Sequence, residues 1–165
     1  MKLTSLLIMI FSLLSNALFG EALQIGSAAP QISTTDHTGR LVNLGQELST
    51  GTVLVFFYPK AMTPGCTKQA CSLRDGWDQL QARQLKIFGV SSDTAASQYD
   101  FRDKYQLPFT LLADTEQKVA KAFGKSRWSR QAYIFRDGVL VWQDLRAATS
   151  RQAEEVLAAL DNLPQ

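Results

Sequence analysis

The feature that most constrains the fold is an unbroken apolar segment at residues 53–58, which reads VLVFFY. Valine, phenylalanine and tyrosine are all enriched in β-strands. A strand with one face in water alternates polar and apolar residues, whereas an unbroken apolar strand is buried on both faces of its sheet. The segment therefore predicts a central strand with other elements packed against both sides.

A helix is predicted directly after this strand. Pro64 suits the first turn of a helix, where its missing N–H is not needed. Gly76 lies further along and weakens the helix without abolishing it. We expect one helix whose apolar residues recur at helical spacing and form a single stripe: Cys66, Ala70, Leu73, Trp77 and Leu80.

Two further pairs of a strand and a helix follow. Residues 85–91 and 109–113 are apolar runs typical of strands. Asp93 is a good N-cap for the helix after the first strand, and Asp114 for the helix after the second. Gly124 is expected just beyond the end of that second helix, where a left-handed glycine is common.

The C-terminal part predicts a hairpin and a last helix. Apolar segments at 132–135 and 139–142 flank the turn sequence RDG at 136–138, which is a hairpin signal. Thr149 or Ser150 would cap the final helix. This order of elements indicates one α/β domain, with a central mixed sheet flanked by helices on both faces.

The N-terminus has the pattern of a secretory signal peptide at residues 1–22, leaving residues 23–165 as the folded domain. Lys2 precedes an apolar stretch at 3–14, and small residues then place the cleavage between about 17 and 22. An uncleaved membrane anchor is the alternative. Cleavage would leave an exported protein, most simply in a bacterial periplasm, with no stable membrane association. A structural disulfide then becomes an alternative role for the cysteines, because oxidising compartments let disulfides persist.

Composition excludes several classes of function. The formal net charge is +2, and the basic residues are scattered among acidic ones, so no basic stripe predicts nucleic-acid binding. The chain has two cysteines and one histidine, His37, which do not match any four-ligand zinc pattern. We expect neither a metal nor another cofactor.

Cys66 has the surroundings of a reactive thiol. It lies in the first turn of the predicted helix, where unpaired N–H groups and the positive end of the helix dipole stabilise an anion such as a thiolate. Gly65 leaves the neighbouring backbone open, and the Thr63 hydroxyl can reach the same place. The alternative is that Cys66 is only a small buried apolar residue of the stripe.

Cys71 lies five residues after Cys66. On an α-helix that spacing gives a net rotation of about 140° and a rise of about 7.5 Å, which separates the Cα atoms by about 8 to 9 Å. A disulfide requires less than about 7 Å, so the helix must unwind locally before the sulfurs can join. The spacing therefore disfavours a permanent structural disulfide, and it also differs from the C-x-x-C of thioredoxin-like oxidoreductases.

These residues resemble a known family. The motif consists of FYPK at 57–60, TPGCT at 63–67, AC at 70–71 and RD at 74–75. Together with similar residues across about 25 to 160, it closely resembles the peroxiredoxin Q subfamily, also called bacterioferritin comigratory protein.

The resemblance implies a thioredoxin-like fold and a thiol peroxidase that reduces hydrogen peroxide and organic hydroperoxides. Cys66 would be the peroxidatic nucleophile and would become a sulfenic acid. Cys71 would resolve it by forming an intramolecular disulfide, which a thioredoxin-like dithiol protein would reduce. A general protein thiol-disulfide oxidoreductase is the alternative. Many relatives are monomers, so a monomer is expected.

The resemblance also assigns the remaining site residues. Thr63 would hydrogen-bond the peroxide and the sulfur, and Pro59 would shield the thiolate from water. An arginine would counter charge on the thiolate and on the leaving oxygen. Arg130, three residues before Tyr133, fits the family's position, and Arg127 is its rival.

Overall fold

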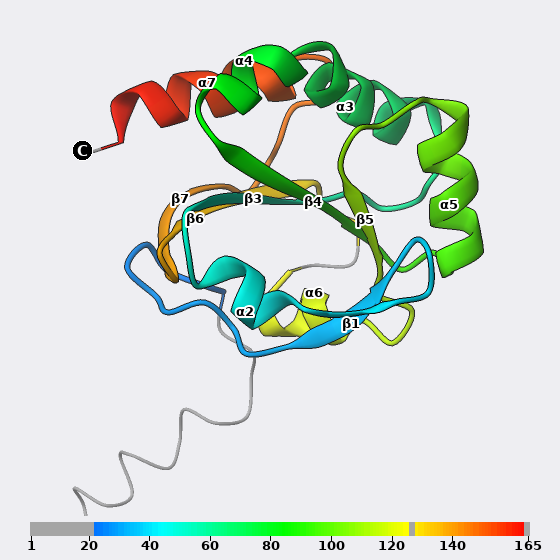
Figure 1. Ribbon diagram of the computed structural model, residues 1–165, viewed down its shortest axis with the longest axis horizontal. Helices are drawn as coiled ribbons and strands as arrows, with labels where there is room; N and C mark the ends of the chain where they lie inside the picture. Colours follow the sequence, from blue (N-terminus) through cyan, green and yellow to red (C-terminus); the bar gives the residue numbers. More distant parts are fainter. Residues whose placement is uncertain (1–21, 126–127, 164–165) are drawn as a thin grey trace, which may run out of the picture.

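A computed structural model describes residues 22–125 and 128–163. They form one seven-stranded mixed sheet with strand order β2-β1-β5-β4-β3-β6-β7 (Figure 1). The strands are β1 (Ser33–Asp36), β2 (Leu41–Asn43), β3 (Thr52–Phe57), β4 (Leu85–Ser91), β5 (Thr110–Ala113), β6 (Gln131–Arg136) and β7 (Val139–Asp144). The helices are α2 (Leu44–Leu48), α3 (Pro64–Asp75), α4 (Trp77–Ala82), α5 (Ala95–Lys104), α6 (Lys118–Ala122) and α7 (Gln152–Asn162).

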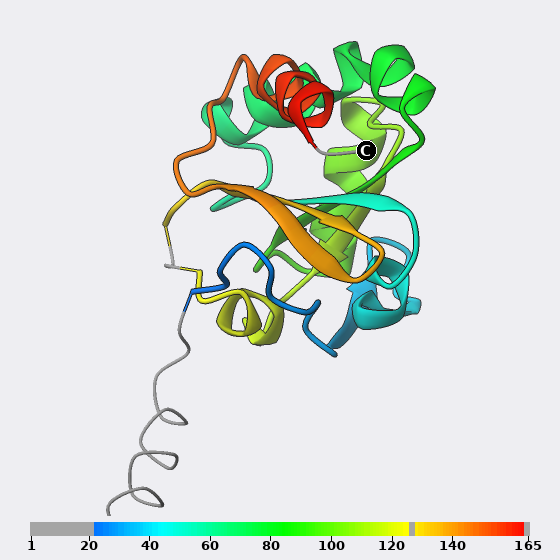
Figure 2. The same ribbon diagram turned by 90° about the vertical axis from the view of Figure 1, so that its left-hand side faces the viewer.

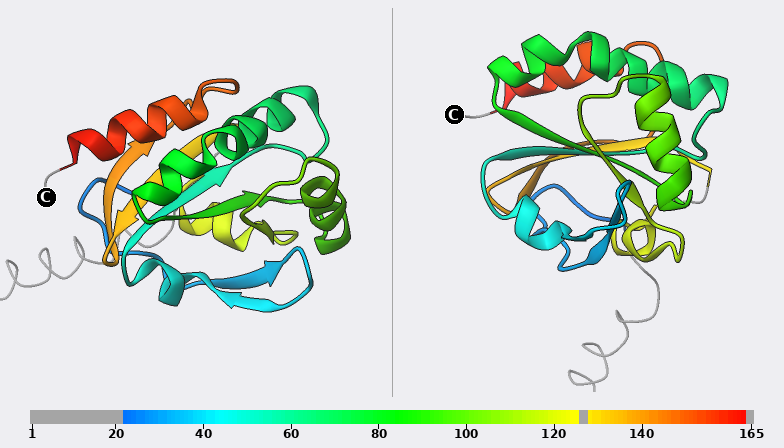
Figure 3. Two further views of the ribbon diagram at one scale, coloured as in Figure 1. Left: turned by 45° about the horizontal axis from the view of Figure 1, so that its top comes forward. Right: turned by 45° about the vertical axis from the view of Figure 1, so that its right-hand side comes forward.

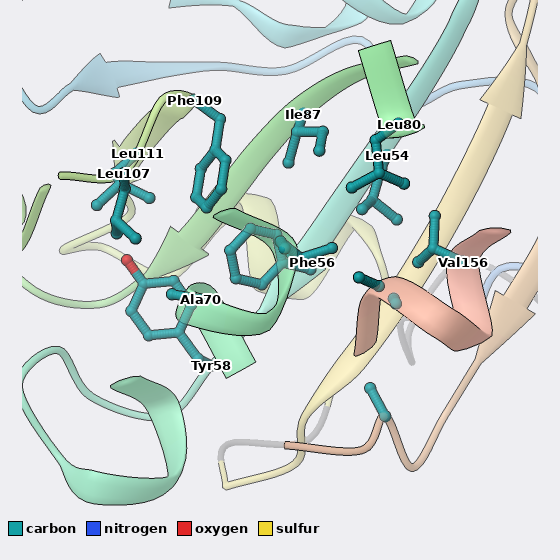
Figure 4. Close-up of a cluster of buried hydrophobic side chains, with 14 of the residues drawn as sticks. Leu54, Phe56, Tyr58, Ala70, Leu80, Ile87, Leu107, Phe109, Leu111 and Val156 are labelled. Atoms are coloured by element: carbon teal, nitrogen blue, oxygen red, sulfur yellow. The ribbon is translucent and has the colours of Figure 1, made fainter. Parts of the chain in front are cut away.

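The apolar segment is the central strand β3, as predicted. It pairs in parallel with β4 on one side and antiparallel with β6 on the other. Its side chains alternate between two buried layers, because successive residues of a strand point to opposite faces. Leu54, Phe56 and Tyr58 join one layer (Figure 4), and Val53 and Val55 join the other.

Helices cover both faces of the sheet. Helices α3, α4 and α7 lie on one side, and α2 and α6 lie on the other (Figures 1 and 3). The first group packs onto the layer of Phe56, with Ala70 and Val156 among its buried residues (Figure 4). The predicted α/β architecture, with a mixed sheet between helical layers, is confirmed.

The single helix predicted after β3 is wrong. Gly76 divides it into α3 and α4, with φ −88° and ψ 8°. A Cβ atom on Gly76 would lie only 2.8 Å from the Ala153 Cβ of α7. The helix therefore breaks where α7 approaches most closely, which is a tertiary contact that helical spacing does not reveal.

Two predicted N-caps are also wrong. The cap of α5 is Thr94, whose hydroxyl accepts from the Ser97 amide at 3.2 Å, so Asp93 is not the cap. The cap of α7 is Arg151, with no side-chain hydrogen bond, rather than Thr149 or Ser150. Packing against the core decides where these helices start, because an N-cap contributes only about 1 kcal/mol.

The remaining local predictions fare better. Both oxygens of Asp114 accept backbone amides at the start of α6, although the formal cap is Gln117. Gly124 follows α6 with φ 63°, and a tight turn at 137–138 joins β6 to β7 as a hairpin. The segment before residue 52 contains β1, β2 and α2, which were not predicted because their short, partly exposed strands carry little apolar pattern.

The predicted signal peptide lies almost entirely outside the described residues. No helix among residues 22–125 and 128–163 is long and apolar enough to cross a membrane.

Candidate functional site

Cys66 lies in the first turn of α3, where the chain turns from β3 into the helix. Thr63 is the N-cap residue, with extended φ −79° and ψ 150°, and Pro64 follows as the first helical residue. Cys66 is fully buried and its thiol is free. The free amides of a helical first turn surround this position, so the local structure favours a negative sulfur.

Arg130 reaches this sulfur from the other end of the chain. Its Nη2 donates to Cys66 Sγ at 3.6 Å. The contact follows from the sheet, because Gln131 at the start of β6 pairs with Phe57 at the end of β3. The residue just before β6 therefore lies beside the loop that leads into α3. Arg127, the rival candidate, lies outside the described residues.

Gly65 keeps the space in which this arginine lies. A Cβ atom at residue 65 would be 2.5 Å from Nη2 of Arg130, which is closer than atoms approach without moving. Gly65 is therefore required for its missing side chain rather than for an unusual backbone conformation.

The structure places Thr63 and Pro59 beside Cys66 in the chain without a direct bond from either to the sulfur among the described residues. The Thr63 hydroxyl donates to the Lys60 carbonyl at 2.9 Å, which leaves its oxygen free to accept a hydrogen bond. Pro59 is half-buried and lines a small cavity with Tyr58 and Ser91. The loop between them includes Met62, whose φ is 63°, an uncommon value for a residue with a side chain.

A polar network fixes this loop, and it was not predicted from sequence. The Asp93 carboxylate accepts from the Ala61 amide at 2.8 Å and from the Ser91 hydroxyl at 2.6 Å. Gln98 continues the network, because its Nε2 donates to Ser91 Oγ at 2.9 Å and its Oε1 accepts from the Tyr58 hydroxyl. Burial raises the pKa of Tyr58, so its hydroxyl stays neutral and donates.

The signal for this network was present in part. Asp93 follows β4 by two residues, and the loop after β3 leaves the same edge of the sheet because the two strands are parallel. Side chains at the carboxyl ends of adjacent parallel strands meet there. Asp93 therefore holds the active loop instead of capping α5.

Cys71 is a half-buried free thiol on the same unbroken helix as Cys66. Burial raises the pKa of Cys71, with a further rise from Asp75 and an opposing effect of Arg74. Arg74 pairs with Asp75 at 2.7 Å and donates to the Tyr105 carbonyl, in agreement with its predicted structural role. In this packed state both sulfurs are thiols on different sides of α3.

Comparison with known proteins identifies the family. The model of the AhpC/TSA family matches residues 25–143. The chain belongs to the AhpC/TSA family. Peroxiredoxin Bcp of Escherichia coli (strain K12) is 42% identical over 112 residues, covering 68% of this chain and 70% of that protein. The chloroplastic peroxiredoxin Q of Oryza sativa subsp. japonica is 46% identical over 99 residues, which are 60% of this chain and 45% of the rice protein.

Solved structures agree with this assignment. Peroxidoxin BcpB from Mycobacterium tuberculosis is 29% identical, with a TM-score of 0.78, covering 87% of this chain and 99% of that one. Peroxiredoxin Q from Xanthomonas campestris is 25% identical, with a TM-score of 0.75, covering 86% of this chain and 97% of that one. The predicted resemblance to the peroxiredoxin Q group and the predicted thioredoxin-like fold are confirmed. The match spans less than half of the rice protein's length.

Proposed function

We propose that this chain is a thiol peroxidase that reduces hydrogen peroxide and organic hydroperoxides. The observation that carries the proposal is the buried Cys66 sulfur in the first turn of α3, 3.6 Å from Nη2 of Arg130. A helix start and a guanidinium both stabilise a thiolate, which is the nucleophilic form of cysteine. The Xanthomonas campestris bacterioferritin comigratory protein, 25% identical to this chain, has been studied for alkyl peroxide reduction activity, which supports the substrate class.

The first step is attack of the Cys66 thiolate on the outer oxygen of the peroxide. An S–O bond forms as the O–O bond breaks, and the departing oxygen takes a proton and leaves as water or an alcohol. Arg130 stabilises the negative charge that moves onto that oxygen. Thr63 offers a hydroxyl oxygen to the peroxide O–H, and Pro59 limits the access of water to the sulfur.

The second step resolves the sulfenic acid. Cys71 attacks the Cys66 sulfur, the S–O bond breaks, and water leaves as the S–S bond forms. The disulfide then holds the two oxidising equivalents taken from the peroxide. A thioredoxin-like dithiol protein reduces it by exchange and restores both thiols.

Peroxide consumption by residues 23–165 tests the proposal. Without a reductant, the wild type should consume one equivalent of peroxide and form an intramolecular disulfide. Cys66→Ser should consume none, and Cys71→Ser should consume its equivalent without forming that disulfide. Consumption that persists in Cys66→Ser would refute the mechanism.

We also propose that the chain is exported to a periplasm, where it acts as a monomer. The apolar segment before residue 23 supports this location. The mass of the protein recovered from a periplasmic fraction should show cleavage between about 17 and 22. Recovery of the full-length chain in the membrane fraction would instead support the uncleaved anchor.

The reductant is then expected to be an exported, thioredoxin-like protein. A mixed disulfide trapped in a resolving-cysteine mutant of such a partner should contain this chain. Trapping by cytosolic dithiol proteins alone would count against the proposal.

A further inference from the structure

Two glutamines are buried against each other between α3 and α7. Gln69 and Gln152 are both 0% exposed, and Gln69 Nε2 donates to Gln152 Oε1 at 2.9 Å. The other amide atoms, Gln69 Oε1 and Gln152 Nε2, have no hydrogen-bond partner among the described residues. Buried amides are normally satisfied, because a buried polar group without a partner is unfavourable. This pair therefore makes one bond where its four donor and acceptor sites invite more.

The pair lies in the turn that separates the two cysteines. Gln69 is three residues after Cys66 and two before Cys71. On the same face of α3, the Ser72 hydroxyl accepts from the Ala153 amide at 3.1 Å. Figure 2 shows α7 lying along α3 on the outer side of the sheet. The turn that must unwind before the sulfurs meet is therefore the turn that is docked on α7.

Unwinding changes the surroundings of the pair. When residues 66–71 leave the helix, Gln69 leaves its burial site, and its unpaired carbonyl oxygen gains hydrogen bonds to water. One amide hydrogen bond is lost, but water replaces it, and the net value of such a bond is small. The unsatisfied atoms thus raise the free energy of the packed helix relative to the unwound one.

We propose that the Gln69–Gln152 pair sets how readily α3 unwinds, and so sets the rate of disulfide formation between Cys66 and Cys71. Both are positioning residues, because neither contacts the reacting sulfurs. The inference rests on the proposed peroxidase function and adds the control of its second step. That step forms the S–S bond, breaks the S–O bond of the sulfenic acid and releases water.

The rate matters because the sulfenic acid has a competing fate. A second peroxide molecule can transfer its oxygen to Cys66 and produce a sulfinic acid, which a dithiol does not reduce. Fast unwinding favours the disulfide, and slow unwinding favours the sulfinic acid. The half-satisfied pair therefore protects the enzyme at high peroxide concentration.

The test follows two phases after reduced protein is mixed with peroxide, by acid quench, thiol labelling and mass spectrometry. The first phase depends on peroxide concentration and reports sulfenic acid formation at Cys66. The second phase does not depend on peroxide and reports disulfide formation. Methionine is a suitable replacement for glutamine because it is unbranched and of similar length.

The single and double variants should act in opposite directions. Gln152→Met leaves Gln69 buried with no partner, so the second phase should become about tenfold faster. Adding Gln69→Met makes both sides apolar, which removes every unsatisfied atom, so the double variant should form the disulfide about tenfold more slowly than the wild type. The double variant should also accumulate more sulfinic acid at high peroxide. The first phase should stay unchanged in both.

Val156→Ala is the matched control, because Val156 is a fully buried residue of α7 outside the glutamine pair. It loosens α7 by leaving a cavity. Equal acceleration by Val156→Ala and Gln152→Met would overturn the inference, as would a double variant that is as fast as the wild type. Urea unfolding confirms that each variant is folded. Absence of the first phase in the wild type would instead refute the proposed function, and the inference would fall with it.

Discussion

Replacing Gly65 by alanine should separate the function of Arg130 from the stability of the fold. The new Cβ atom would lie 2.5 Å from Nη2 and 3.3 Å from Cζ of Arg130. Ordinary contact begins at 3.4 Å, so the end of the guanidinium must move by about 1 Å. The end of a long flexible side chain can move that far while the backbone of α3 stays in place.

The size of the effect follows from the contact that is lost. Nη2 donates to Cys66 Sγ at 3.6 Å, and this is the only hydrogen bond to that sulfur printed by the geometry of the described residues. A hydrogen bond from a charged group contributes about 1.5–3 kcal/mol. If that stabilisation is lost in the transition state, the rate constant for oxidation of Cys66 by peroxide falls by about 10- to 150-fold.

Stopped-flow measurement of Cys66 oxidation over a range of peroxide concentrations gives this rate constant. The matched variant is Arg130→Ala, and the two changes are then combined. Because Gly65→Ala acts through Arg130, it should have almost no further effect when the arginine is absent. Its folded state should be at least as stable as the wild type, since alanine favours a helix over glycine by about 1 kcal/mol. A Gly65→Ala protein with wild-type kinetics, or additive losses in the double variant, would refute the reasoning.

Three further predictions test other parts of the structure. Asp75→Asn removes a charge that raises the pKa of Cys71, so at pH 7 its thiolate fraction, and with it the rate of disulfide formation, should rise about twofold; an unchanged rate in quench experiments would contradict this. Gly89→Ala places a Cβ atom 2.7 Å from two core side chains, which should lower the free energy of unfolding in urea by about 1–3 kcal/mol. Burial opposes ionisation of Asp36, but hydrogen bonds from the turn that follows it lower its pKa overall; stability should therefore be lost as the pH falls below about 4, and Asp36→Asn should reduce that loss in acid titrations of unfolding.

The parts of the fold that were predicted are those with a strong local pattern. An unbroken apolar run gave β3 its place at the centre, and a turn with Asp137 and Gly138 at positive φ gave the hairpin. The parts that failed depend on neighbours distant in sequence. Gly76 ends α3 because Ala153 lies against it, and the caps of α5 and α7 lie where packing sets the ends of the helices.

The site divides in the same way. The position of Cys66 at a helix start could be predicted from Pro64 and the preceding strand, because both signals lie within a few residues. Arg130 came only from family resemblance, since no local pattern distinguishes it from a solvated loop arginine. The bond from Ala61 to Asp93 was missed because it joins loops that follow two different strands.

Helix α3 meets two requirements that conflict. Its first turn stabilises a thiolate at Cys66, which needs the helix to be formed, but the same helix holds Cys71 about 8 to 9 Å away by Cα atoms. No single conformation serves both steps, so α3 must be stable enough to bind peroxide and unstable enough to open afterwards. The unsatisfied atoms of Gln69 and Gln152 lie in the turn where this balance is set. A better packed interface with α7 would make a more stable helix, and for that reason a slower second step.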